Sequence, residues 1–330
     1  MGEHDGQSGM GSGFDRAPVR IGVSACLLGE KVRFDGGHKR DAFLVETFGR
    51  HVEWVPVCPE VELGMGTPRE PIRLEREGGK IRLVGVKTAT DHSQAMRAFA
   101  ARRCEQLARE ELDGYILKKD SPSCGMERVK VYDRHGVPAR TGIGLFADAL
   151  RRRLPNLPVE EEGRLSDPRL RENVIERVFA CQRLRRLFAG RWTAGTLVRF
   201  HTAHKLLLMA HSPQAYERLG RLVAQAPSLP RAELRSRYEA EFVRALAAIA
   251  TPRRHANVLQ HMLGYFTTIL DDESRRELAG AIEDYRGGLV PLIVPITLFR
   301  HHIRRCDVSY LAGQIYLEPH PRELMLRNHV

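Results

Sequence analysis

Short apolar runs, rich in β-branched residues and bounded by Gly, Pro and Ser, recur through the first half of the chain. Three of them have the length and composition of β-strands: residues 19–23, 52–57 and 114–117. A cysteine follows each run within a few residues: Cys26, Cys58 and Cys124. If the strands are parallel neighbours, all three cysteines leave the carboxyl edge of one sheet. That edge is where open α/β sheets bind ligands.

The remaining pattern of the first half completes an α/β domain. Residues 72–74 and 80–84 are predicted to form a hairpin, and residues 157–159 a further short β element. Apolar residues at helical spacing predict a long helix over residues 91–112. Shorter helices or turns are expected at three places: residues 41–50, 61–65 and 147–154.

The pattern changes to a helical period beyond Asp167 and Pro168. The segments that carry it are residues 170–188, 194–210, 213–224, 231–250, 252–270, 272–285 and 290–305. Prolines stand near three of the expected starts, where proline is tolerated: Pro213, Pro252 and Pro291. The expected fold class is therefore an α/β domain with a parallel sheet, followed by a second, all-α domain.

These patterns divide the chain into four segments. They are a disordered N-terminus at 1–17, an α/β domain with the cysteines at 18–155, an all-α basic domain at 165–310 and a C-terminal tail at 311–330. The first residues lack the apolar stretch of a signal peptide, and no apolar run approaches the roughly 20 residues of a membrane helix. Six cysteines without a secretory signal indicate a reducing compartment, so a cytoplasmic location is expected.

The net charge of +11 is concentrated in the second half of the chain. Residues 1–150 carry 23 Lys and Arg against 22 Asp and Glu, whereas residues 151–330 carry 29 against 19. This asymmetry favours a polyanionic partner, although a merely arginine-rich surface gives the same count.

His201 and His204 share a helix face in this half. Because no acidic or cysteine partner stands nearby, a structural or RNA-facing role is favoured for them over metal binding.

Thiolate is a soft ligand that favours zinc, copper(I) and iron–sulfur clusters. Cys58 follows Cys26 by 32 residues and Cys124 follows Cys58 by 66, so these three include no close pair of the kind common in structural zinc sites. Three ligands on separate loops fit an iron–sulfur cluster with one open iron, or a catalytic zinc with one open position. Three incidental buried thiols are the alternative. The remaining cysteines lie in helical patterns and are interpreted as non-ligands: Cys104, Cys181 and Cys306.

Polar residues near the cysteines are candidates for proton transfer and substrate positioning. Glu60 lies two residues after Cys58, where a carboxylate can activate water or cap a helix. Asp35 can orient a ligand or water, or form an Asp-Gly turn. Ser121 can bond to a substrate or only to its own turn.

Four segments together resemble the thiouracil desulfidase family. They are VSACLLG at 23–29, RFDG at 33–36, VCPE at 57–60 and LKKDSPSCG at 117–125, and the resemblance spans about residues 18–155. The region from about 170 to 310 resembles a second domain that is often fused to the first. The motif that carries this second resemblance is RFHTAHKLLLMAHS at 199–212. The fused two-domain proteins resemble tRNA 4-thiouridine desulfidases.

The resemblance implies a [4Fe-4S] cluster held by Cys26, Cys58 and Cys124, with a fourth iron that has no protein ligand. It implies a non-redox reaction in which that iron binds the sulfur of a thiolated pyrimidine and water replaces the sulfur, which leaves as hydrosulfide. Glu60, and less directly Asp35, would handle protons, and Ser121 would help to fix the substrate. Thiolated tRNA is the expected partner, and 4-thiouridine is the expected target.

Two other interpretations stay open on the sequence. The same desulfidation could act on free thiouracil or on a thionucleotide, with the helical domain serving another partner. The second is a non-catalytic RNA-binding protein that is stabilised by a metal ion, with zinc on the three cysteines and a histidine such as His38.

Overall fold

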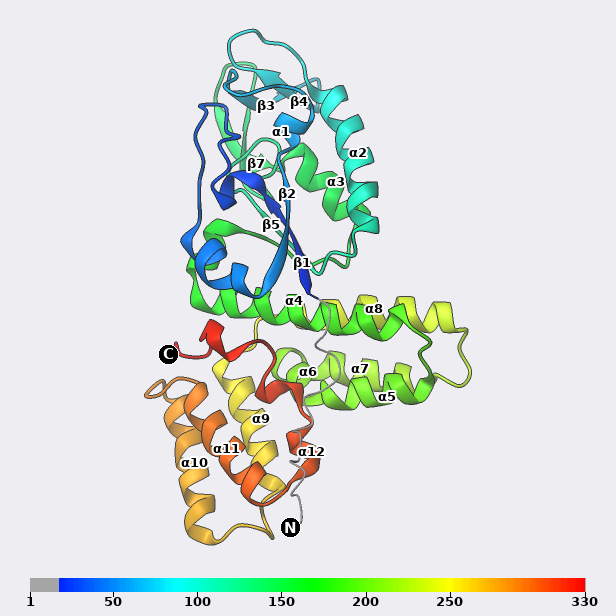
Figure 1. The fold of residues 1–330 in the computed structure, drawn as a ribbon, viewed down its shortest axis with the longest axis vertical. Helices are drawn as coiled ribbons and strands as arrows, with labels where there is room; N and C mark the ends of the chain where they lie inside the picture. The colour runs from blue at the N-terminus through cyan, green and yellow to red at the C-terminus, as the bar shows by residue number, and fades with distance from the viewer. Residues whose placement is uncertain (1–17, 330) are drawn as a thin grey trace, which may run out of the picture.

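The computed structural model describes residues 18–329, so the predicted disordered N-terminus at 1–17 lies outside the described residues. An α/β part with two sheets stands on a helical part, as Figure 1 shows. This arrangement confirms the predicted fold class. No helix within the described range is long and apolar enough to cross a membrane.

The first sheet consists of four parallel strands in the order β2-β1-β5-β8. They are β1 (Val19–Ser24), β2 (Val52–Val57), β5 (Gly114–Leu117) and β8 (Val159–Glu161). The three strands predicted before the cysteines are therefore adjacent and parallel. The chain leaves β1 toward β2 on one side, and leaves β5 toward β8 on the other. The loops diverge at the carboxyl edge, which opens a crevice there.

Both faces of this sheet are buried, which explains its nearly continuous apolar strands. Val19, Ile21 and Val23 of β1 belong to one core, and Tyr115 and Leu117 of β5 belong to the other. The elements that cover the second face are α2 (Ser93–Arg109) and α3 (Leu145–Arg153). The first face is covered by α4 (Pro168–Ala189) and by two turns, a π-helical turn (Phe43–Thr47) and a 3₁₀ turn (Phe48–Arg50).

The second sheet has the order β4-β3-β6-β7. It consists of β3 (Ile72–Glu77), β4 (Lys80–Gly85), β6 (Val129–Tyr132) and β7 (Pro138–Gly142). The β3–β4 hairpin was expected from the sequence, whereas β6 and β7 were not. Four residues of β7 are exposed, so this edge strand lacks the apolar alternation that identifies a strand.

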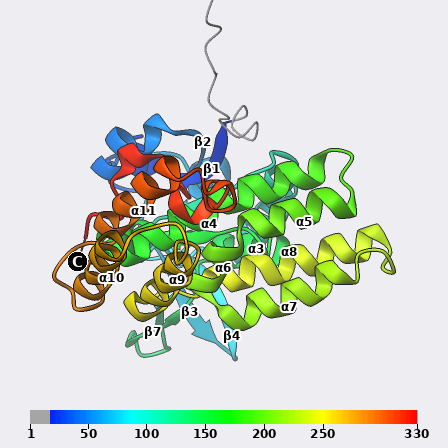
Figure 2. The same cartoon turned by 90° about the horizontal axis from the view of Figure 1, so that it is seen from below.

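The helical part follows the predicted periodicity with one break. Its helices are α5 (Ala194–Ala203), α6 (Lys205–His211), α7 (Pro213–Ala224), α8 (Arg231–Ala247), α9 (Pro252–Gly264), α10 (Asp272–Arg286) and α11 (Ile293–Arg305). The single helix expected over 194–210 is divided at His204. Figure 2 shows α5, α7 and α8 on one side of α6, and α9, α10 and α11 on the other.

Helix α4 belongs to both parts of the molecule. Val174, Ile175 and Val178 pack in the core that includes β1, whereas Leu184 and Phe188 pack in the core of the helical part. The Arg185 side chain of α4 also donates to Asp113, which lies just before β5, at 2.9 Å. The two parts are therefore joined through a shared helix.

The segment after α11 folds back over α4. It contains α12 (Ser309–Ala312) and two 3₁₀ turns, Ile315–Leu317 and Arg322–Leu324. Tyr316 is buried in the helical core, and Leu324 and Leu326 are buried in the core that includes β1. Most of the stretch expected as a C-terminal tail at 311–330 therefore packs against both parts of the protein.

Candidate active site

The three cysteines that follow the parallel strands line one pocket of about 400 Å³. Cys26 lies in a 3₁₀ turn (Ala25–Leu28) directly after β1, and Cys58 directly precedes α1 (Pro59–Glu62) after β2. Cys124 lies in the loop after β5. The pocket thus sits at the carboxyl edge of the first sheet, where the strand order predicts a crevice.

Backbone hydrogen bonds hold the cysteine loops in place. The Cys26 carbonyl accepts from the Gly29 amide at 3.3 Å and from the Lys39 amide at 2.9 Å, which ties the following loop back to the turn. Gly29 has φ +99°, a left-handed conformation that favours glycine. In the Cys124 loop, the Ser121 hydroxyl oxygen accepts from the amides of Ser123 at 3.2 Å and Cys124 at 3.0 Å.

Burial dominates the acid–base behaviour of the three thiols. It raises the pKa of Cys26 to about 11, and it raises the pKa values of Cys58 and Cys124 as well. Negative charge on Cys58 further raises the pKa of both other thiols, so the sulfur atoms are electrostatic neighbours. A hydrogen bond from Ser24 opposes the rise at Cys124. The thiols need a positively charged partner to become thiolates together.

Glu60 lines the pocket and is held by an arginine. Arg69 donates to the Glu60 carboxylate from Nε at 3.0 Å and also from a terminal nitrogen. The same guanidinium donates to the Val32 carbonyl at 3.0 Å and the Gly66 carbonyl at 2.8 Å. The Arg69 side chain is only 5% exposed. It therefore ties α1, the loop that contains Val32 and its own loop together beside the pocket, and it fixes the orientation of Glu60.

The other two predicted site residues take different positions. Ser121 lines the pocket beside Cys124, and its hydroxyl proton is free to point elsewhere because its oxygen only accepts the two amide bonds. Asp35 is exposed and is not among the residues that line the pocket. It accepts from the Gly37 amide at 3.0 Å and from Arg33, the arrangement of an Asp-Gly turn. A direct proton-transfer role for Asp35 stays a prediction.

The rest of the lining combines positive charge with one aromatic ring. The cationic lining residues are Arg33, Lys39, Arg69, Lys118 and Lys119, against two acidic ones, Glu60 and Asp120. Phe34 also lines the pocket and is 38% exposed, an unusual degree for its size. The sequence did not predict Arg69 or Phe34 as site residues, although Phe34 belongs to the RFDG motif at 33–36.

Residues that were expected to lie outside the site do so. Cys104 is buried on α2 among core residues, and Cys181 lies on α4. His201 and His204 are buried in the helical part. His201 Nδ1 lies 3.2 Å from the Tyr238 hydroxyl, and His204 Nδ1 lies 2.8 Å from the Phe200 carbonyl. Their burial supports the structural role over the RNA-facing one.

Comparison with known proteins matches both halves of the chain. A family model for 2-thiouracil desulfurase matches residues 21–162, and a model for a family of unknown function, DUF1722, matches residues 205–321. The uncharacterized protein YbgA of Escherichia coli (strain K12) is 35% identical over 161 residues, which are 48% of this chain and 95% of YbgA. The uncharacterized protein YbbK of Bacillus subtilis (strain 168) is 32% identical over 108 residues, 31% of this chain and 71% of YbbK.

A solved structure, the [4Fe-4S]-dependent thiouracil desulfidase TudS, is 30% identical to the chain. The match covers 45% of this chain and 93% of that chain, with a TM-score of 0.38. The structure itself defines the class as an α/β fold with three cysteines around one pocket, joined to a helical part. The chain belongs to the 2-thiouracil desulfurase family through its α/β part, and its helical part is a DUF1722 region.

Proposed function

We propose that this protein is a desulfidase that removes sulfur from 4-thiouridine in tRNA, leaving uridine and hydrosulfide. The observation that carries the proposal is the convergence of Cys26, Cys58 and Cys124 on one pocket together with Glu60. Family membership supports the chemistry of sulfur removal from a thiolated pyrimidine. The tRNA substrate is supported by the positive charge of the pocket and of the second half of the chain.

The donor set fits a [4Fe-4S] cluster better than a single metal ion. All three thiols are free, and burial keeps competing water away from them. Among residues 18–329, the one group of three ligand atoms within 4.8 Å of one another lies elsewhere in the protein. At least two of the three cysteine sulfur atoms therefore lie more than 4.8 Å apart, which exceeds the edge of a zinc tetrahedron with Zn–S bonds of about 2.3 Å. A cluster suits such spacing because each thiolate binds a different iron.

Cys26, Cys58 and Cys124 would hold this cluster. The related protein TudS is described as [4Fe-4S]-dependent. When bound, the cluster would supply an iron without a protein ligand, a Lewis acid with affinity for sulfur. Binding needs thiolates, so loading of the cluster releases protons and is favoured by alkaline conditions.

The surrounding residues position the reactants. Glu60, oriented by Arg69, accepts a proton from the water that adds to the thiocarbonyl carbon. The carbon–sulfur bond breaks, the carbon–oxygen bond forms, and no electrons are exchanged with an external donor. The Ser121 hydroxyl donates a hydrogen bond to the pyrimidine. Phe34 provides a planar apolar surface against which the base can stack.

Charge supports a polyanionic substrate rather than a free base. Cationic side chains outnumber acidic ones around the pocket, and the second half of the chain carries the excess of Lys and Arg. Several clusters of basic residues have structural partners, however. Arg185 pairs with Asp113, Arg300 pairs with Glu318, and Arg254 donates to the His211 carbonyl. We therefore expect the exposed lysines at the pocket to make the main contacts with the tRNA phosphates.

Two of those lysines provide a specific prediction. Lys39 and Lys119 are exposed and line the pocket, whereas Lys87 is exposed and does not line it. The double substitution Lys39→Ser and Lys119→Ser should lower kcat/KM on 4-thiouridine tRNA about tenfold and reduce its salt dependence. Turnover of free 4-thiouracil should be unchanged, and Lys87→Ser should act as wild type on both. If free thiouracil is the better substrate of the wild type, desulfidation of a free base or nucleotide replaces this proposal.

Iron and sulfide content after anaerobic purification is the direct test of the cofactor. We expect about four irons per chain in the wild type, loss of iron and activity in Cys58→Ser, and retention of iron with loss of activity in Glu60→Gln. A colourless protein that contains zinc and releases no hydrosulfide would instead support the non-catalytic RNA-binding interpretation.

A further inference from the structure

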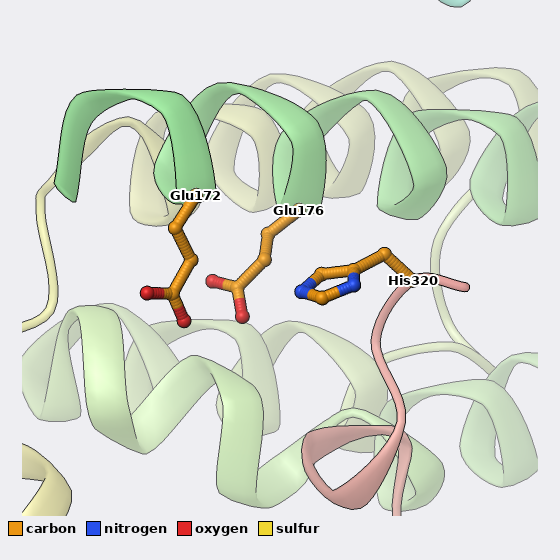
Figure 3. A group of neighbouring side chains, drawn as sticks. All are labelled: Glu172, Glu176 and His320. Carbon is orange, nitrogen blue, oxygen red and sulfur yellow. The ribbon is translucent and has the colours of Figure 1, made fainter. Parts of the chain in front are cut away.

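A second group of ligand-type side chains lies between α4 and the C-terminal segment, apart from the cysteine pocket. Glu172 and Glu176 stand one turn apart on α4 and are 9% and 2% exposed. His320 of the C-terminal segment faces them and is 8% exposed (Figure 3). The proposed reaction uses none of these three groups.

An arginine already satisfies part of this group. Arg327 Nε donates to one oxygen of Glu172 at 3.1 Å, and Arg327 Nη2 donates to one oxygen of Glu176 at 2.6 Å. Two buried carboxylates against one guanidinium leave one negative charge to be balanced. In keeping with this excess, burial and the neighbouring Glu176 raise the pKa of Glu172. A proton or a metal ion must supply the missing positive charge.

His320 is oriented as a ligand and not as a hydrogen-bond donor to the carboxylates. Its Nδ1 lies 3.1 Å from the Pro321 carbonyl, an acceptor, so Nδ1 carries the ring proton and Nε2 has a bare lone pair. Within the described residues Nε2 is buried and has no hydrogen-bond partner. Burial also lowers the pKa of His320 to about 4, which keeps the ring neutral. Histidine ligands of metals commonly have this pairing of one ring nitrogen with a backbone carbonyl.

One ligand atom from each of Glu172, Glu176 and His320 lies within 4.8 Å of the other two. Arg327 donates to one oxygen of each carboxylate, whereas His320 Nε2, which faces them, has no hydrogen-bond donor within the described residues. We propose that Glu172, Glu176 and His320 bind a divalent transition-metal ion of the zinc and manganese class. Mixed carboxylate and imidazole donors favour these ions over calcium and magnesium, which prefer oxygen ligands.

The surroundings provide an approach to this site and a consequence of binding. A second pocket of about 260 Å³ is lined by Glu172, Glu176, His211 and His329, and provides a route for the ion. His329 Nε2 lies 3.5 Å from Glu172, so a further imidazole is available nearby. Because the ligands come from α4 and from the C-terminal segment, the ion would tie that segment to the helix that joins the two parts. The inference does not depend on the proposed desulfidase activity.

His211 provides the competing source of positive charge. Its Nε2 lies 3.0 Å from Glu176 and its Nδ1 lies 2.6 Å from the Ala248 carbonyl. Both neighbours are acceptors, so a doubly protonated His211 would satisfy both and would balance the charge without a metal ion. A binding measurement separates the two cases.

Manganese(II) is the probe of choice because thiolates bind it poorly, which keeps it out of the cysteine pocket. Full-length protein treated with a chelator is titrated with Mn²⁺, and free Mn²⁺ is followed by electron paramagnetic resonance. We expect about one ion per chain, displaced by Zn²⁺. His320→Leu should weaken binding at least about tenfold. His302→Leu is the matched control, since His302 is also buried with a ring nitrogen that has no partner in the described chain.

Absence of Mn²⁺ and Zn²⁺ binding to the wild type, or equal binding by His320→Leu, would overturn the proposal in favour of the protonated histidine. If His320→Leu does not fold, Glu172→Gln replaces it in the binding test, because the glutamine amide oxygen still accepts from Arg327. Binding should persist in Cys58→Ser, whereas iron is lost in that variant. Loss of Mn²⁺ binding with Cys58 would place the ion in the cysteine pocket and would also overturn the proposal.

Discussion

At the scale of single residues, one hydroxyl oxygen organises the loop that carries Cys124. Ser121 Oγ accepts from two backbone amides, those of Ser123 and Cys124. The neighbouring hydroxyl of Ser123 is buried and has no hydrogen-bond partner within the described residues. The two serines of this motif therefore differ: Ser121 accepts two backbone hydrogen bonds, whereas the Ser123 hydroxyl makes none within the described residues.

Alanine at each position should separate these roles. Ser121→Ala leaves two amides without their acceptor, so we expect a loss of about 1–3 kcal/mol in unfolding free energy and a lower iron content per chain. Ser123→Ala removes only an unsatisfied hydroxyl and should be neutral or slightly stabilising. Urea denaturation and iron analysis of both variants check this. Equal effects of the two substitutions would contradict the assignment of the loop bonds to Ser121.

Single residues also show what the sequence can predict of the site. The convergence of Cys26, Cys58 and Cys124 follows from strand patterns, because each cysteine lies in the turn or loop that follows a strand of one parallel sheet. The importance of Arg69 does not follow, because the tertiary fold brings its partners Val32 and Glu60 to it. The polar loop around Arg69 carries no periodic pattern. Nor does the sequence distinguish Asp35 in a turn from Asp35 in a pocket.

At the scale of elements, the position of β1 beside β5 depends on a residue without a side chain. Gly22 of β1 pairs with Tyr115 of β5, and a Cβ at Gly22 would lie 2.1 Å from Tyr115 Cδ2. Tyr115 is fully buried, so its ring has no room to move away. The close approach brings the Cys26 loop and the Cys124 loop together.

Gly22→Ala should therefore destabilise the first sheet. Overpacking of a tight core costs about 1–3 kcal/mol or more, and we expect a loss at the upper end, measured by urea denaturation, with reduced iron content. Gly190→Ala is the control, because a Cβ there would meet no atom within 4 Å and its φ is −101°. A neutral Gly22→Ala would mean that the two strands can separate without loss of stability.

Elements with strong periodicity can be predicted, and elements fixed by tertiary contacts cannot. The strands β1, β2 and β5 are short, buried and β-branched, and they lie where the pattern places them. The exposed strand β7 has no such pattern. The break between α5 and α6 at His204 has neither Gly nor Pro to signal it. Tertiary contacts meet at this break, where Gln314 donates to the Thr202 carbonyl and accepts from the Leu206 amide.

At the scale of the whole molecule, buried neutral histidines make stability depend on pH. Burial lowers the pKa of His201 to about 4 and the pKa values of His204 and His255 to about 3. Below about pH 6.5 the unfolded chain takes up protons at these positions while the folded protein does not. This contribution to stability is therefore present above pH 6.5 and is lost as the pH falls.

Each such histidine should lower the unfolding free energy by up to about 1.4 kcal/mol per pH unit between about pH 6.5 and 5. Urea denaturation across this range measures the slope. His255→Gln, which keeps a polar partner for the Tyr316 hydroxyl, should reduce the slope by about one proton. An unchanged slope in this variant would show that His255 is protonated in the folded protein.

Domain limits are the part of the architecture that periodicity describes least well. The change from strand to helix patterns places a limit near residue 155, yet β8 pairs with β5 and α4 covers one face of the first sheet. Leu324 and Leu326 of the C-terminal segment pack in that same core. A helical period shows that a segment is a helix but not which sheet it packs on.

Removal of residues 311–330 should consequently destabilise the cysteine-bearing sheet as well as the helical part. The deletion takes away Leu324 and Leu326 from the core around β1, and it removes Arg327 from Glu172 and Glu176. The single variant Arg327→Met leaves the apolar contacts in place and should cost about 3–5 kcal/mol, the cost of an unpaired buried charge. The deletion should cost more, because apolar burial is lost in addition.

Hydrogen exchange of the β1 amides distinguishes a shared core from two independent domains. If the core is shared, β1 exchanges faster in the deletion variant than in Arg327→Met, and faster in both than in the wild type. If the α/β part is independent, β1 exchange stays at the wild-type rate while the helices are lost. Because β1 positions Cys26, a shared core also means that the C-terminal segment supports the geometry of the thiol pocket from the far side of α4.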